Sequence, residues 1–110
     1  MDSPQQHVRD ELRLFVAERD WAQFHSPANL AKSVSIEAAE LLECFQWSDD
    51  YDKAEVRLEL ADVLTYAYLL ADRLGESPEH LILEKLAITR EKYPSATARG
   101  RSDKYDKFSN

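Results

Sequence analysis

The chain has 110 residues, of which 44% are hydrophobic and 32% charged, with a net charge of −7 and a single cysteine. This length and balance suit one globular domain, and one cysteine excludes an internal disulfide framework. The acidic charge argues against duplex nucleic acid as a partner, because phosphates require neutralisation by Lys and Arg. The first residues, "MDSPQQHVRD", lack the basic and apolar regions of a signal peptide, and no apolar run is long enough to span a bilayer. We therefore expect a cytoplasmic protein without a membrane partner.

Helix-start signals divide the chain clearly. Three Ser-Pro pairs each place a capping hydroxyl before a proline suited to the first helical position; they lie at 3–4, 26–27 and 77–78. A fourth start is Asp52, with Glu55 at capping-box spacing. Apolar residues recur at helical spacing after each start, and no segment alternates like a strand. The sequence predicts helices at about 4–20, 27–47, 52–74 and 78–92.

Four helices joined by short loops predict an all-α, four-helix bundle-like protomer. Residues 1–93 are expected to form this helical domain, and residues 94–110 a polar tail that is extended or partly disordered. The segment "LELADVLTYAYLLA" at 58–71 is apolar around nearly its whole circumference, so we expect its helix to be buried on all sides. A protomer of four helices rarely buries a helix so completely. We therefore expect a homo-oligomer.

Acidic residues interrupt two of the apolar segments. Glu59 and Asp62 are the only charged residues of segment 58–71, and their i, i+3 spacing places them on one helix face. In the segment "VSIEAAELLECFQW", Glu37 and Glu40 lie on a helical wheel between two apolar ridges, whereas Glu43 lies further round and is expected to be solvated. Acidic pairs of this spacing are common on exposed helices, but a buried carboxylate is costly unless it is paired or bound to a metal.

Two helices that each carry an acid-x-x-acid pair on an inward face can bring four carboxylates together. An all-oxygen, anionic cluster suits a hard cation, so we expect Mg²⁺, with Mn²⁺ as the alternative. Zinc is disfavoured because no His/Cys set accompanies the acids, and a ferritin-like di-iron site because Glu-x-x-His pairs are missing. The expected metal ligands are Glu37, Glu40, Glu59 and Asp62.

Aromatic and basic residues offer further candidates. Trp21, Trp47 and Tyr66 fit a helical core, and Trp47 and Tyr66 would also suit stacking on a base above a metal–phosphate site. Cys44 fits a small core position. Many of the basic residues lie from Lys85 onward, where they are either solvated or available to a phosphate; the candidates are Lys85, Arg90, Lys92 and Lys104.

The order of these motifs resembles one family. The run "ERDWAQFHSPANLAKSVSIEAAELLECFQW", then "ELADVLTYAYLLAD", then "KLAITREKYP" and a late "KY" are similar to the all-α MazG-like nucleotide pyrophosphohydrolases, and within them to the dCTP pyrophosphatase branch. The resemblance covers about residues 12–105. It implies Mg²⁺-dependent hydrolysis of a nucleoside triphosphate between the α and β phosphates, in a dimer or a dimer of dimers.

The resemblance also implies roles for single residues. It assigns Glu37, Glu40, Glu59 and Asp62 to the metal. It places Trp21, Trp47 and Tyr66 around the base, and it matches His25 and Asn29 to an "FHxPxN" stretch that follows the first tryptophan.

The sequence departs from the dCTP-type pattern at two positions. Thr89 stands where an asparagine contacts the base, and Leu12 stands where a base-pocket histidine can occur. Both departures concern the choice of base and leave the acidic residues unchanged.

These observations lead to one hypothesis and two alternatives. The hypothesis is metal-assisted hydrolysis of dCTP or a related pyrimidine dNTP, with Glu40 accepting a proton from water and Lys85 and Lys92 holding the pyrophosphate. One alternative keeps the enzyme and changes the substrate to another or a damaged nucleotide, or to a related pyrophosphate ester. The other is a non-catalytic, metal-binding or partner-binding helical oligomer.

Overall fold

The computed structural model describes residues 3–102, which form helices and, within that range, no strand. The predicted all-α class is confirmed, and all four predicted helices are present. The first three end slightly earlier than expected. The elements in chain order are α1 (Pro4–Glu18), the 3-10 helix η1 (Ala22–Phe24), α2 (Pro27–Glu43), α3 (Lys53–Arg73), α4 (Pro78–Lys92) and α5 (Ser95–Ala98).

Side-chain caps begin three of these helices, as the sequence predicts. Ser3 Oγ accepts a hydrogen bond from the backbone N–H of Gln6, and Ser26 Oγ accepts one from Asn29. The Asp52 carboxylate accepts one from the N–H of Ala54. Each cap satisfies one of the backbone donors that a helix start leaves unpaired, so local sequence alone sets where α1, α2 and α3 begin.

The α1–α2 connection holds an aromatic side chain in place. Asp20 adopts a left-handed backbone conformation (φ 52°), which Asp tolerates better than most residues, and the chain reverses there. Trp21 then packs edge-on against Phe15, with ring centroids 5.5 Å apart. The Arg19 guanidinium lies 3.8 Å from the centroid of the Phe15 ring, a cation–π geometry. These contacts fix Trp21 beside α1.

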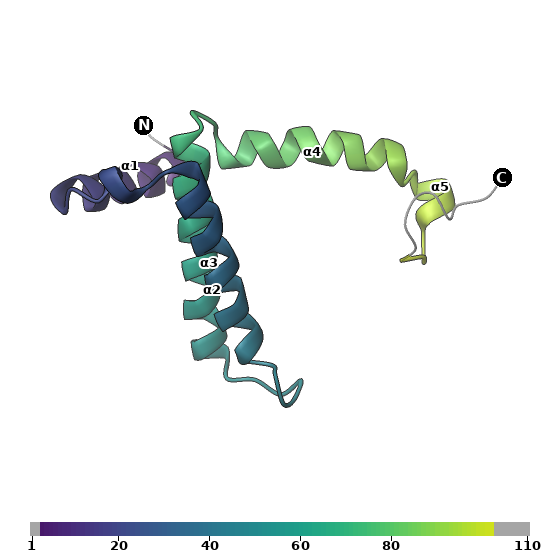
Figure 1. The fold of residues 1–110 in the computed structure, drawn as a ribbon. Coiled ribbons are helices and arrows are strands. Elements are labelled where there is room, and N and C mark those ends of the chain that lie inside the picture. Colours follow the sequence, from purple (N-terminus) through teal and green to yellow (C-terminus); the bar gives the residue numbers. More distant parts are fainter. Residues whose placement is uncertain (1–2, 103–110) are drawn as a thin grey trace. The chain divides into compact units, whose positions relative to one another are not determined.

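Helices α2 and α3 run antiparallel and side by side, and α1 lies against α3 (Figure 1). Leu30, near the start of α2, is only 1% exposed, and Ala71, near the end of α3, is 5% exposed. The tightest packing of this unit therefore lies at the end where α1, α2 and α3 meet.

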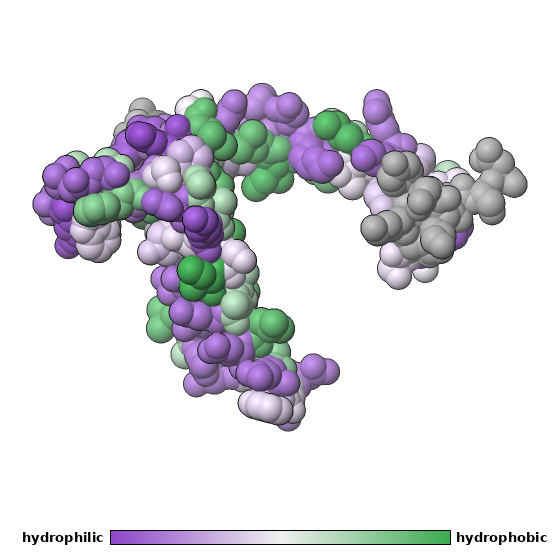
Figure 2. Space-filling view, in the orientation of Figure 1, coloured by the Kyte–Doolittle hydropathy of each residue, from purple (hydrophilic) through white to green (hydrophobic). Residues whose placement is uncertain are grey.

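Much of α3 is more exposed than its composition predicts. Leu58, Leu60 and Leu64 are 70%, 44% and 50% exposed, so a single chain does not bury this helix on all sides, and its burial in a homo-oligomer stays a prediction. The physical reason is that α2 covers one side of α3 and α1 only one end. Figure 2 shows hydrophobic side chains reaching the surface along α2 and α3.

The described residues fall into two compact units that divide after Pro78. The second unit contains α4, whose apolar residues Ile82 and Leu83 are 64% and 65% exposed, and α5. Within the predicted tail, Ser95–Ala98 form a short helix. None of the helices within residues 3–102 is long and apolar enough to cross a membrane.

Candidate active site

Helices α2 and α3 bring three carboxylates together. Glu37 and Glu40 are one turn apart on α2, and Glu59 lies on the facing helix α3. One carboxylate oxygen from each of the three lies within 4.8 Å of the other two. We call these residues the acidic cluster. It arises from the i, i+3 spacing on α2 and from the packing of α2 against α3.

Two oxygens of the acidic cluster are buried without a partner. Glu37 Oε2 and Glu59 Oε2 are inaccessible to solvent, and neither has a hydrogen-bond partner among the described residues. Leaving such atoms unsatisfied is costly, and more so for ionised carboxylates. A hard divalent cation would satisfy both oxygens, because carboxylate oxygens are the ligands that Mg²⁺ and Mn²⁺ prefer.

The raised pKa values in the acidic cluster also favour a bound cation. The pKa of Glu37 is raised, first by loss of hydration, then by its interaction with Glu40, and further by Asp62 and Glu59. The pKa of Glu59 is raised by loss of hydration and then by the charges of Glu40 and Asp62. In both cases the charged neighbours that raise the pKa are acidic, and no cation from residues 3–102 is among the causes.

Asp62 lies close to the cluster without joining its closest group. Its charge acts on both Glu37 and Glu59, and it is exposed. It also lines a cavity of about 220 Å³, so it connects the acidic cluster to that cavity. We call this the aromatic cavity; its other lining residues are Leu12, Phe15, Val16, Trp21, His25, Thr65, Tyr66 and Leu69.

Of the five residues that the resemblance assigns to the base or to the "FHxPxN" stretch, three line the aromatic cavity: Trp21, Tyr66 and His25. The other two do not. The Asn29 amide donates a hydrogen bond to the Phe24 carbonyl oxygen at 3.0 Å, which secures the α1–α2 connection. Trp47 is 89% exposed. It lies in the loop that connects α2 to α3 and does not line the cavity.

The substrate-binding residues predicted in the C-terminal quarter belong to the second compact unit, which begins after Pro78. Lys85, Thr89 and Lys92 lie on α4, and the Thr89 hydroxyl donates a hydrogen bond to the Lys85 carbonyl oxygen at 3.0 Å. Lys104 lies outside the described residues. A role for these side chains at the substrate stays a prediction from the sequence.

Several lining residues were not singled out from the sequence as site candidates. These residues are Phe15, Val16, Thr65 and Leu69. A signal was present, because Thr65 and Leu69 follow Asp62 by three and seven residues and so continue its face of α3. What the pattern lacked was the position of α1, which turns this face into a cavity.

The fold and these side chains define a class of protein: an all-helical chain with an all-carboxylate candidate metal centre beside an aromatic cavity. The sequence comparison supplies the family. A model of the MazG-like family matches residues 32–108, so the chain belongs to the MazG-like family.

The individual relatives agree with this placement. The chain is 40% identical to human dCTP pyrophosphatase 1 over 94% of its own length and 68% of that protein. It is 37% identical to the mouse protein of the same name over the same shares. A solved pyrophosphatase from Archaeoglobus fulgidus is 39% identical and superposes with a TM-score of 0.79, over 86% of this chain and 95% of the archaeal one. The resemblance to the dCTP pyrophosphatase branch is confirmed, and the chain is placed among the nucleotide pyrophosphohydrolases.

Proposed function

We propose that the protein hydrolyses dCTP or a related pyrimidine deoxynucleoside triphosphate to the monophosphate and pyrophosphate, with Mg²⁺ as cofactor. The observation that carries this proposal is the acidic cluster beside a cavity with aromatic walls, because two of its oxygens are buried and have no hydrogen-bond partner in the part of the chain that the structure describes. The names of the relatives support the choice of substrate.

In this proposal Glu37, Glu40, Glu59 and Asp62 hold the metal. When bound, Mg²⁺ neutralises triphosphate charge and orients a water for attack on phosphorus. The donor set fits a hard cation, because all four side chains offer carboxylate oxygens. One oxygen from each of Glu37, Glu40 and Glu59 lies within 4.8 Å of the other two. Mn²⁺ meets the same requirement.

The aromatic cavity would hold the base. The Trp21 ring is fixed by Phe15, so stacking a base on it costs little additional ordering. Tyr66 and His25 supply polar groups in the same lining. Because Asp62 lines this cavity as well, a base held there places the phosphates toward the acidic cluster.

Glu40 is the proposed proton acceptor. It is the exposed member of the cluster, so it can reach a water from the solvent side and take its proton during attack. The bond between the α phosphorus and the bridging oxygen breaks, and pyrophosphate leaves. Lys85 and Lys92 are the candidates to stabilise its charge, and Thr89 is a candidate for contact with the base.

We also propose that the working form is a homo-oligomer, a dimer or a dimer of dimers, in the cytoplasm. The exposed apolar residues support an oligomer, because large leucines and isoleucines on α3 and α4 would be removed from water by a second copy. Light scattering coupled to size exclusion measures the state directly. A monomer at micromolar concentration would overturn this part of the proposal.

A panel of the four dNTPs, incubated with Mg²⁺ and assayed for pyrophosphate and monophosphate, tests the reaction. We expect turnover with pyrimidine substrates, dCTP fastest, and none when the metal is chelated. Release of orthophosphate instead of pyrophosphate would contradict cleavage between the α and β phosphates. Metal binding without turnover of any nucleotide would favour the non-catalytic helical oligomer.

Asp62→Asn tests the four-acid site, because it removes one negative charge and almost no volume. We expect loss of turnover with unchanged helical content and oligomeric state. The matched control is Asp49→Asn, which makes the same change at an exposed position before α3 and should leave turnover unaltered. Full activity of Asp62→Asn would remove Asp62 from the metal site.

A further inference from the structure

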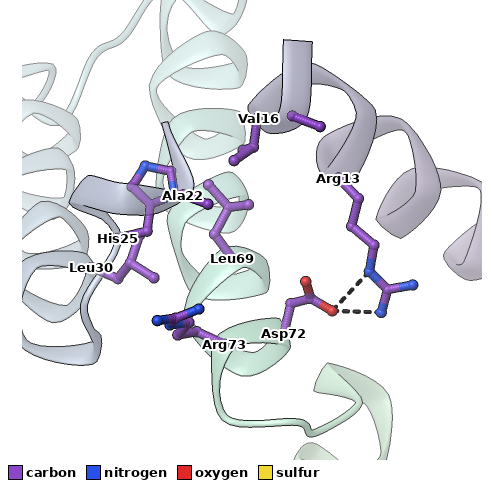
Figure 3. A pocket seen from close by; sticks show the side chains of 9 residues that line it. Arg13, Val16, Ala22, His25, Leu30, Leu69, Asp72 and Arg73 are labelled. Atoms are coloured by element: carbon purple, nitrogen blue, oxygen red, sulfur yellow. Dashed lines mark hydrogen bonds and ion pairs between the residues drawn. The ribbon is translucent and has the colours of Figure 1, made fainter. Parts of the chain in front are cut away.

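A second cavity, of about 210 Å³, lies among α1, the η1 segment and the C-terminal part of α3 (Figure 3). We call it the arginine cavity, because Arg13 and Arg73 both line it. The acidic cluster takes no part in its lining. It shares Val16, His25 and Leu69 with the aromatic cavity, so the two cavities have a common wall.

The polar groups of the arginine cavity leave one positive charge uncompensated. Arg13 donates from both Nε (3.0 Å) and Nη2 (2.5 Å) to the same oxygen, Asp72 Oδ1, so these two charges offset each other (Figure 3). Arg73 has no hydrogen bond or ion pair to any residue in the described range 3–102. Among the Arg and Asp side chains of the lining, the charge of Arg73 is therefore the one that no opposite charge within residues 3–102 offsets.

The rest of the lining is apolar. It consists of Val16, Leu69, Ala17 and Ala22, together with Leu30, which is only 1% exposed and therefore offers little surface of its own. An inorganic anion could neutralise Arg73 but would leave these surfaces in contact with water. A neutral apolar molecule would cover them and leave Arg73 without a counter-charge. A ligand with both an anionic end and an apolar body matches both parts of the lining.

We propose that the arginine cavity binds a small amphipathic anion of the short-chain carboxylate class. Its carboxylate pairs with the Arg73 guanidinium, which matches that planar group well, and its hydrocarbon part lies against the apolar lining. The proposal requires neither metal nor nucleotide, so it stands or falls separately from the proposed hydrolysis.

The test is a titration of the full chain, in metal-free buffer at constant ionic strength, with acetate, propionate and butyrate. Amide chemical shifts in ¹H–¹⁵N spectra report the position of binding. We expect the affinity to rise about fourfold with each added methylene, because burying one contributes about 0.8 kcal/mol. The shift changes should centre on Ala22, His25 and Arg73. A series with no methylene dependence, or with changes centred elsewhere, would overturn the proposal.

Two variants test separately the binding of the ligand's carboxylate and of its hydrocarbon part. Arg73→Gln removes the charge from an exposed position, and we expect all three affinities to fall about tenfold or more by the same factor. Ala17→Leu places apolar volume in the cavity, and we expect it to abolish the gain per methylene. Arg57→Gln is the matched control, because Arg57 is exposed on the same helix but outside this cavity. Equal weakening in Arg57→Gln and Arg73→Gln would show non-specific attraction and refute the site.

Discussion

Replacing Glu59 by Gln should raise the stability of the metal-free protein and abolish its response to Mg²⁺. Gln keeps the size of the side chain and removes its charge. The Glu59 carboxylate has a buried oxygen without a hydrogen-bond partner in residues 3–102, and its pKa is raised by lost hydration and by the charges of Glu40 and Asp62. The folded state therefore tolerates this charge poorly, whereas a bound cation would require it.

The direction of this stability change follows from the linkage between protonation and folding. A raised carboxyl pKa means that the folded state holds the Glu59 proton more tightly than the unfolded chain does. Stability is therefore lost as the pH rises above the unfolded pKa, and the loss is complete above the folded pKa. In alkaline, metal-free buffer the wild type carries this full penalty and Glu59→Gln does not, so the variant should melt at the higher temperature.

Mg²⁺ should reverse this order of melting temperatures, so that the wild type melts above Glu59→Gln. At a free concentration a hundred times Kd, a ligand that binds only the folded state adds about 2.7 kcal/mol to the free energy of unfolding. For a domain of this size that raises Tm by about 10 °C or more. We expect this rise in the wild type and a rise of less than about 2 °C in Glu59→Gln, measured by circular dichroism melting with and without Mg²⁺.

The control is Glu43→Gln, at an exposed position on α2 outside the acidic cluster. It should melt like the wild type in metal-free buffer and gain the same increment from Mg²⁺. The reasoning is refuted if Glu59→Gln is the less stable protein without metal, or if Mg²⁺ stabilises it as much as it stabilises the wild type.

Three further changes test the fold and the aromatic cavity. Leu30→Ala, at the most buried side chain of the described residues, should cost about 2–5 kcal/mol in a denaturant titration, and a cost below 1 kcal/mol would contradict its place in the core. Ser26→Ala removes the cap of α2 and should cost about 1 kcal/mol in the same assay. Trp21→Ala should raise the KM for the preferred dNTP roughly 5- to 150-fold if the base stacks on it. Phe24→Ala, at a 61% exposed ring outside the aromatic cavity, should leave KM unchanged, and equal effects of the two aromatic changes would exclude a specific role for Trp21.

Local signals in the sequence determined where the helices begin. Ser-Pro and Asp caps act within three or four residues, so the starts of α1, α2 and α3 could be predicted without any tertiary contact. Helix ends were less predictable. The pattern placed the end of the second helix at 47, whereas α2 ends at Glu43, because apolar residues at helical spacing continue into the following turn.

The acidic pairs were also determined by the sequence, since i, i+3 spacing puts two side chains on one helix face whatever surrounds them. Which pairs meet was decided by the packing of α2 on α3, which unites Glu37, Glu40 and Glu59 and leaves Asp62 at the edge, in the aromatic cavity. Equally, only the tertiary structure distinguished Trp21 in that cavity from Trp47 at the surface. Spacing along one helix carries no information about the neighbouring helix, and a cavity exists only where side chains from several elements converge.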